Sequence, residues 1–246
     1  MIISFFCLLG EFGIFVKDTL STFLHIYKRR AICVIQFKKI GYDSLILIVV
    51  TSAFTGLVSA LQASYLTKGF VPDSLISVMV SKMAMVELAP VLTSLVFAGK
   101  VGATISAEIG SMKVTEQLEA LETMSVNVHE YIYMPKLFAT LIMLPLLTIV
   151  SIFITIVFAF AFSNQVNYIS SYTFFSNMKS FFDPLDLWIG LTKSFFFGFL
   201  ITNIANFNGS KTENGAEGVG KATTNTVVYS SIGILMMDFL VARLFL

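Results

Sequence analysis

The sequence predicts an all-α integral membrane protein with about five transmembrane helices and an N-terminal interfacial amphipathic helix. Of its 246 residues, 56% are hydrophobic and only 13% are charged, and the mean hydropathy is +0.84. A soluble domain carries about 25% charged residues, so this chain is too poor in charge to cover a surface that faces water. Several apolar runs also reach the roughly 20 residues that a helix needs to cross about 30 Å of hydrocarbon.

Residues 1–42 are predicted to form an interfacial N-terminal segment. Between positions 21 and 39, apolar residues are mixed with lysines and arginines, a composition suited to the headgroups of an anionic leaflet. The apolar stretch 1–16 is short and is interrupted by Glu11, and it lacks the features of a cleaved signal peptide. If residues 2–16 crossed the membrane, only the N-terminus would change sides.

Residues 43–246 are predicted to form one membrane domain with five spans. Lysine and arginine are concentrated just before the first span, so the positive-inside rule keeps the N-terminus cytoplasmic and places the C-terminus outside. The segments 111–130 and 208–221 then also face the cytoplasm. Hydropathy places the five spans at about 43–66, 84–107, 136–162, 184–206 and 222–245.

The second span carries a row of small residues at every fourth position. Positions i and i+4 share one face of a helix, and small side chains there let two backbones approach closely in a bilayer. We therefore expect a tight helix–helix or dimer contact along this row. The row consists of Ser94, Ala98, Gly102, Ser106 and Gly110.

Charged residues inside the spans indicate a polar cavity between helices, because a charge near the bilayer centre costs about 2.5–3.5 kcal/mol. Lys193 lies near the middle of the fourth span, and Asp238 in the fifth span is a candidate partner for an ion pair. Lys100, Glu108 and Glu87 lie nearer the ends of the second span, so they could instead reach the headgroups. The candidate cavity residues are Glu87, Lys100, Glu108 and Lys193.

The segment that follows the second span is acidic and amphipathic. From Val114 onward, apolar residues recur at i, i+4 and i+7, the spacing of one helix face. Glu116, Glu119 and Glu122 lie between them, and like charges three residues apart weaken an isolated helix slightly. The segment is either an ordinary solvated helix or a surface that docks on a basic partner.

Four further classes of site are not supported by the sequence. Its two cysteines lack the CxxC spacing of a metal site, and the net charge of +1 does not indicate nucleic-acid binding. Neither histidine belongs to a catalytic motif. The run NGAEGVGKATT resembles a phosphate loop, but Ala222 occupies the Mg²⁺-binding Ser/Thr position and no strand precedes it. We expect the glycines of this run to form a tight turn between two closely packed helix ends.

Two long motifs carry a resemblance to a known family. One is FAGKVGATISAEIGSMKVTEQLEALETMSVN, which begins at Phe97, and the other is NGAEGVGKATTNTVV, which begins at Asn214. With them, residues 40–246 resemble the MlaE/YrbE-type permeases, the membrane subunits of bacterial lipid ABC transporters that work with MCE proteins. Departures are small, since Lys100 and Lys221 replace frequent arginines and so keep the charge.

The resemblance implies a homodimer in the bacterial inner membrane and a coupling helix near 112–126 that docks on a cytoplasmic ABC ATPase. ATP and Mg²⁺ would bind to that ATPase, so no cofactor and no metal are expected on this chain. A periplasmic MCE-domain protein would cap the dimer. The implied coupling residues are Glu116, Gln117, Glu119, Ala120, Leu121, Glu122 and Met124.

The sequence therefore predicts a non-catalytic permease subunit that helps to move phospholipid between the inner and outer membranes. The phospholipid would occupy a cavity between the two copies. The alternative is a stand-alone ion-coupled secondary transporter with Glu87, Lys193 and Asp238 as its relay. That alternative predicts broken helices or paired half-repeats, which the sequence does not display. A lipid-modifying enzyme would need a nucleophile–base pair, and none is evident.

Overall fold

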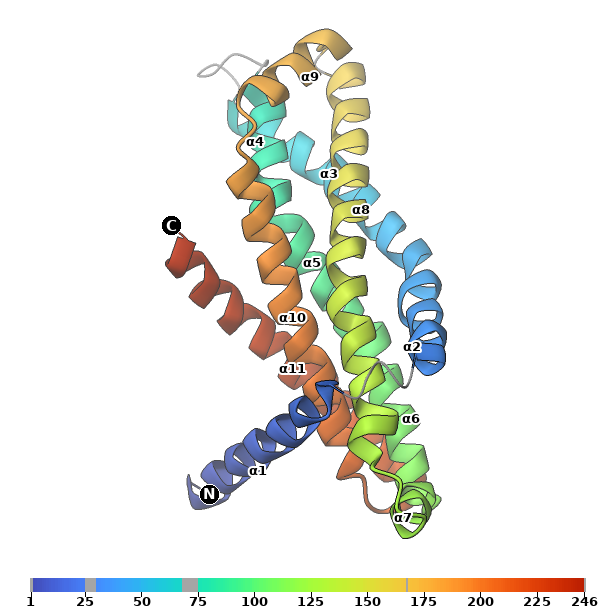
Figure 1. Ribbon diagram of the computed structural model, residues 1–246. Helices are drawn as coiled ribbons and strands as arrows, with labels where there is room; N and C mark the ends of the chain where they lie inside the picture. The colour runs from blue at the N-terminus through green and yellow to red at the C-terminus, as the bar shows by residue number, and fades with distance from the viewer. Residues whose placement is uncertain (1, 25–29, 68–74, 167, 246) are drawn as a thin grey trace.

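The computed structural model describes residues 2–24, 30–67, 75–166 and 168–245, and the regular elements in these ranges are all helices (Figure 1). Five helices are long and apolar enough to cross a membrane. They span Ala31–Leu66, Ile76–Val114, His129–Val166, Pro184–Ser210 and Gly215–Phe245. The prediction of an all-α protein with five spans and a preceding N-terminal helix is confirmed.

The N-terminal region contains two helices with different surroundings. Helix α1 (Ile2–Ser21) projects from one side of the bundle (Figure 1). Helix α2 (Arg30–Phe37) instead continues through the π-helical turn η2 (Lys38–Tyr42) into α3 (Asp43–Thr67). The first long helix thus begins well before position 43, because the apolar residues of α2 continue its hydrophobic surface. The predicted surface location of 1–42 remains a prediction, and the loop expected at 68–74 lies outside the described residues.

The second span is one long helix that contains two π-helical turns. Its parts are α4 (Ile76–Met83), η4 (Ala84–Leu88), α5 (Ala89–Phe97), η5 (Ala98–Gly102) and α6 (Ala103–Val114). The whole helix has 39 residues. At 1.5 Å per residue it is about 58 Å long, which exceeds the 40–45 Å of a bilayer with its headgroups. The helix is thus longer than a perpendicular crossing of the bilayer requires.

A short helix stands at the end of the bundle where the second span ends. This helix, α7 (Gln117–Thr123), is flanked by Glu116 and Ser125, whose φ angles of 59° and 60° are left-handed. The chain then enters η6 (His129–Tyr133) and α8 (Met134–Val166). Helix α9 (Ser171–Ser180) lies at the opposite end of the bundle from α7 (Figure 1).

The last two helices, α10 (Pro184–Ser210) and α11 (Gly215–Phe245), are joined by a turn of only four residues, 211–214. The expected loop at 208–221 is therefore shorter than predicted. Asn214 and Gly215 both have left-handed φ angles, which complete the turn and allow a helix to start at once. Gly218 belongs to this helix, and a Cβ there would overlap the carbonyl oxygen of Glu213.

Close helix contacts in the bundle depend on small residues. Helix α3 packs mainly against α8, and a Cβ at Gly56 would overlap the carbonyl oxygen of Thr155. In the same contact, the hydroxyl groups of Ser52 and Ser151 are hydrogen-bonded at 2.7 Å. Helices α10, α11 and α6 also pack against one another. The bundle therefore brings the second, fourth and fifth spans together, and the charged residues of these spans meet there.

Candidate functional site

Lys193 is the centre of a charged cluster inside the bundle. Its side chain is fully buried, and its Nζ atom lies 2.6 Å from Glu87 Oε1 and 2.8 Å from Asp238 Oδ1. The expected ion pair with Asp238 is thus present, and Glu87 is a second partner. The side chains of Glu87 and Asp238 are 43% and 22% exposed, so both carboxylates remain accessible from outside the cluster. We call these three residues the Lys193 cluster.

The close approach of α10 to η4 positions this cluster. Gly190 lies one helical turn before Lys193, and a Cβ at position 190 would overlap the carbonyl oxygen of Met85 in η4. Only a glycine therefore allows α10 close enough for Lys193 to reach Glu87, which belongs to the same π turn. Asp238 completes the cluster from α11, so one lysine connects three spans.

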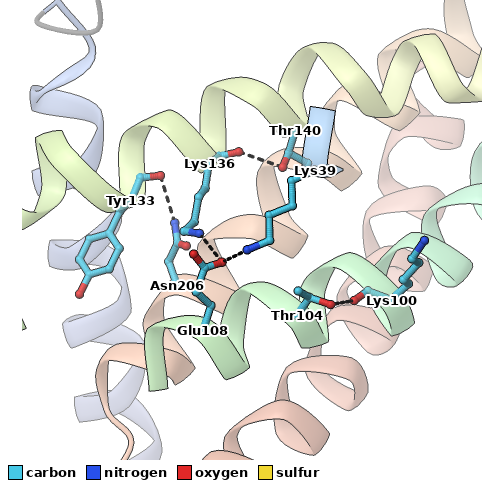
Figure 2. Close-up of polar contacts among 8 residues, drawn as sticks. All are labelled: Lys39, Lys100, Thr104, Glu108, Tyr133, Lys136, Thr140 and Asn206. Carbon is cyan, nitrogen blue, oxygen red and sulfur yellow. Dashed lines mark hydrogen bonds and ion pairs between the residues drawn. The ribbon is translucent and has the colours of Figure 1, made fainter. Parts of the chain in front are cut away.

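A second cluster lies around α6, the helix that precedes α7, and its charges are arranged in the opposite way (Figure 2). Glu108 on α6 accepts hydrogen bonds at Oε2 from Lys136 at 2.8 Å and from Lys39 at 2.7 Å. The side chain of Lys136 is only 2% exposed, whereas that of Lys39 is 43% exposed. We call these three residues the Glu108 cluster. It joins η2, α6 and α8.

Sequence reasoning missed Lys39 and Lys136 as partners of Glu108. Both lie at the boundaries of predicted spans, where a lysine usually extends toward the headgroups. The only available signal was that Lys136 follows Pro135 at the start of an almost uninterrupted apolar run. Its position along the chain does not reveal that the packing of α8 against α6 buries its ammonium group.

The four candidate cavity residues fall into two separate groups. Glu87 and Lys193 belong to the Lys193 cluster. Lys100 and Glu108 instead line a cavity of about 210 Å³ between η2 and the η5–α6 part of the second span. In that cavity the Nζ atom of Lys100 donates a hydrogen bond to the backbone carbonyl oxygen of Asp43. Their shared role in holding lipid remains a proposal.

The row of small residues on the second span is buried inside the chain. Ser94, Ala98 and Ser106 have no exposed surface. Positions 102 and 110 are close to α10 and the α10–α11 turn, since a Cβ at Gly102 would lie 3.1 Å from Ile201 and one at Gly110 would lie 2.8 Å from Thr212. The row therefore faces neighbouring helices of the same chain in this structure.

Helix α7 presents most of the implied coupling residues to the outside. Leu118 is only 4% exposed and anchors the inner side of the helix, with Leu121 half-buried against the same core. The outer side exposes three glutamates among neutral residues. We call this the α7 surface, and it consists of Glu116, Gln117, Glu119, Ala120, Glu122 and Met124.

A lysine on the preceding helix supports the position of α7. The Nζ atom of Lys113 lies 2.7 Å from Glu119 Oε1, and this ion pair bridges α6 to α7 across the left-handed residue Glu116. The remaining carboxylates of the α7 surface have no ion-pair partner among the residues whose positions are described. They are therefore available to a basic partner.

Groups that could hold a metal ion are absent from the described part of the chain, where no three His, Cys, Asp or Glu side chains converge suitably. The charged residues that do converge are lysine–carboxylate clusters, in which each carboxylate is already paired with an ammonium group. Such clusters can orient helices or bind charged groups of a ligand. They do not form a nucleophile–base pair.

Comparisons with known proteins agree with this arrangement. The chain matches the family described as Permease MlaE over residues 33–244. It is 35% identical to a probable ABC transporter permease protein of Rickettsia bellii over 96% of this chain and 92% of that protein. It is 34% identical to the intermembrane phospholipid transport system permease protein MlaE of Haemophilus influenzae, over 99% and 94% of the two chains. A probable ABC transporter permease protein of Synechocystis is 34% identical over 91% and 86%.

Proposed function

The chain belongs to the MlaE permease family of non-catalytic ABC transporter subunits, and from this premise we propose that it moves phospholipid between bacterial inner and outer membranes. The name of the Haemophilus influenzae relative, which is similar to this chain over nearly its whole length, supports this substrate. A partner ATPase would supply the energy. Burying acyl chains contributes about 0.8 kcal/mol per CH₂ group, so releasing a bound lipid requires such an input.

The α7 surface is the observation that carries this proposal. It is a short helix fixed to the bundle by the buried side chain of Leu118, with exposed carboxylates at Glu116 and Glu122. A helix that is rigidly attached to the end of a long span can transmit a movement of its partner into the membrane. We propose that α7 docks in a basic groove of the cytoplasmic ATPase, where ATP and Mg²⁺ bind.

The proposed assembly contains two copies of the chain. Helix α11 leaves many apolar side chains exposed along its outer part, including Leu235, Phe239 and Leu240. In the proposed homodimer, the spans near this surface enclose a cavity for one phospholipid, with charged residues such as Glu108 and Lys193 near its lining. The N-terminus and α7 would be cytoplasmic, and the C-terminus and α9 would face a periplasmic MCE-domain protein.

Affinity purification from native membranes in a mild detergent tests the proposal. The wild-type chain should co-purify with an ATPase, and the Glu116→Lys/Glu119→Lys/Glu122→Lys variant should lose it, because the exchange turns attraction to a basic groove into repulsion. Both proteins should unfold at nearly the same temperature, since the three side chains are exposed.

A matched control replaces the same three residues by aspartate and keeps every negative charge. This control should retain the ATPase. If the lysine variant binds the ATPase as well as wild type does, the α7 surface is not the docking site. If the wild-type chain brings down no ATPase at all, the proposed transporter is wrong.

One observation bears on the alternative of a stand-alone ion-coupled transporter. Glu87, Lys193 and Asp238, the relay that this alternative requires, do contact one another. The same contacts equally suit a permease in which one lysine holds three spans together. Reconstitution separates the two functions, because lipid or ion transport by the purified chain without an ATPase would favour the alternative.

A further inference from the structure

The cavity between η2 and η5 has a polar lining that differs from the Lys193 cluster. Lys39 reaches it from η2 and Lys100 from η5, while Glu108 lies farther along the same helix as Lys100 (Figure 2). Two π-helical turns from different spans therefore face each other across the cavity. Such turns are rare in proteins and frequently occur at functional sites.

Two polar groups of the cavity lining are buried without a partner. Ser44 is only 2% exposed, and its hydroxyl group makes no hydrogen bond within the described part of the chain. The same holds for the side-chain carbonyl oxygen of Gln36. A buried polar group without a partner costs about 1–3 kcal/mol. A ligand in the cavity would give both groups a partner.

The charges around the cavity do not cancel. Lys39 and Lys136 share the single carboxylate of Glu108, and Lys100 donates to a backbone carbonyl rather than to a carboxylate. The lining itself contains two ammonium groups, those of Lys39 and Lys100, and two carboxylates, those of Glu108 and Asp43. Lys136 does not line the cavity, but its bond to Glu108 brings a third ammonium group next to it. One positive charge is therefore left uncompensated, which fits the single negative charge of a phosphate diester.

The size of the cavity suits a small polar group. Its volume of about 210 Å³ is below the roughly 300–1,000 Å³ of pockets for drug-sized ligands. A phosphate ester with its glycerol or alcohol substituent is small enough for it, whereas a whole lipid is not. Glu108 lies six residues before the end of α6 at Val114, hence about 9 Å along the helix axis. This distance places the cavity toward the α7 end of the bundle.

We propose that this cavity binds the phosphate group of a phospholipid from the leaflet on the α7 side, with Lys39, Lys100 and Ser44 as donors. Lys39 is 43% exposed and can approach the phosphate while it keeps one bond to Glu108. The buried ammonium group of Lys136 holds the Glu108 carboxylate in place. The inference rests on the proposed function for its choice of a lipid, whereas the anion-binding chemistry comes from the cavity itself.

Lipid binding to the delipidated full-length protein in detergent micelles tests this site. Native mass spectrometry would count bound phosphatidylglycerol and phosphatidylethanolamine as each lipid is titrated. Lys39→Gln/Lys100→Gln should bind both lipids about tenfold or more weakly, because hydrogen bonds from charged donors are lost. Lys39→Arg/Lys100→Arg should retain most of the binding, since a guanidinium group also binds phosphate.

The matched control is Lys17→Gln/Lys179→Gln, which removes two exposed lysines that do not line the cavity. It should bind lipid like wild type, and an equal loss in this control would show nonspecific attraction and overturn the site. If Lys39→Gln/Lys100→Gln fails to fold, lipid binding by Ser44→Ala tests the site instead. This variant removes one proposed donor to the phosphate and no charge, and it should bind lipid more weakly than wild type. Unchanged binding in Ser44→Ala and in any folded lysine variant would reject the proposal.

Two further arms identify the ligand and separate this site from the proposed function. Inorganic phosphate in large excess should not displace the lipid, and binding of inorganic phosphate in place of lipid would assign the cavity to a free anion. Lipid transport is then measured in vesicles with the ATPase present. Lysine-dependent lipid binding by a wild-type protein that does not transport lipid would keep the site and reject the proposed function. If wild type transports lipid and a lysine variant with weakened binding transports it equally well, the proposed function stands and the site has no part in transport.

Discussion

The two lysines that are buried within the described part of the chain are surrounded by opposite arrangements of charge. Lys193 contacts two carboxylates, those of Glu87 and Asp238, so its cluster has a net charge of −1. Lys136 shares the one carboxylate of Glu108 with Lys39, so the Glu108 cluster has a net charge of +1. Each cluster connects three helical segments of the bundle. They differ in how many partners the buried ammonium group can lose before it is left unpaired.

This difference determines whether a buried lysine can lose one carboxylate partner and still be paired. A buried charge without a counter-charge is costly, and breaking such a pair destabilises a protein by about 3–5 kcal/mol. Lys193 keeps one carboxylate when the other is removed, whereas Lys136 has only Glu108 among its described partners. The Glu108 cluster should therefore be sensitive to a single substitution, and the Lys193 cluster should tolerate one.

The largest effect should come from Glu108→Ala, which leaves the buried Lys136 without its counter-charge. We expect a loss of about 3–5 kcal/mol in the free energy of unfolding. Thermal unfolding in detergent, followed by circular dichroism, measures this loss. Glu119→Ala, which removes an exposed carboxylate nearby, is the control and should have little effect. An unfolding temperature for Glu108→Ala that equals that of wild type would contradict the comparison.

The next effect concerns the Lys193 cluster, where the losses of stability caused by removing its two carboxylates should not be additive. Glu87→Ala and Asp238→Ala should each cost about 1–2 kcal/mol, because the other carboxylate still pairs with Lys193. The double variant should lose more than the sum of the two, because neighbouring residues that share a partner are coupled. A double-mutant cycle of unfolding free energies measures the coupling. Purely additive losses would show that the two carboxylates do not substitute for each other.

An effect of similar size to those single substitutions tests how the Lys193 cluster is positioned. Gly190→Ala places a Cβ against the carbonyl oxygen of Met85 and forces α10 away from η4. Such overpacking costs about 1–3 kcal/mol. Gly99→Ala is the matched control, since a Cβ at position 99 meets no heavy atom within 4 Å. If both variants unfold at the same temperature, the contact of α10 with η4 does not position Lys193.

The smallest effect should come from the exposed ion pair between Lys113 and Glu119. Their side chains are 33% and 52% exposed, so solvent screens the attraction. Lys113→Ala should therefore cost only about 0.2–1 kcal/mol. The same unfolding measurement provides the baseline against which the buried clusters are judged. A loss as large as that of Glu108→Ala would mean that α7 is essential to the stability of the whole bundle.

The fold was largely predictable because hydropathy reports directly on the apolar part of each span. The helices extend beyond that part, as at Ser111–Val114, because the backbone hydrogen bonds of a helix continue through residues of lower hydropathy. A window that averages hydropathy finds the centre of such a helix and loses its polar ends. The short turn after α10 was missed for the same reason, since the glycine-rich start of α11 is polar.

The charged sites were predictable only in part. The pairing of Lys193 with Asp238 follows from two opposite charges in neighbouring apolar spans. The Glu108 cluster does not follow in this way, because Lys136 and Lys39 lie 28 and 69 residues from Glu108 and meet it only through helix packing. The π-helical turns were also invisible, because one extra residue in a helix hardly changes its hydropathy.

The two π-helical turns of the second span determine in which direction around the helix axis the side chains after them point. Successive residues of an α-helix are about 100° apart around its axis. Removing Gly99 would let η5 relax to an α-helical turn and would rotate the stretch Ala103–Val114 by about that angle. The Glu108 carboxylate would then swing away from α8, and α7 would face a different direction. A single-residue deletion at a π-helical turn of this helix would therefore change the direction in which α7 faces.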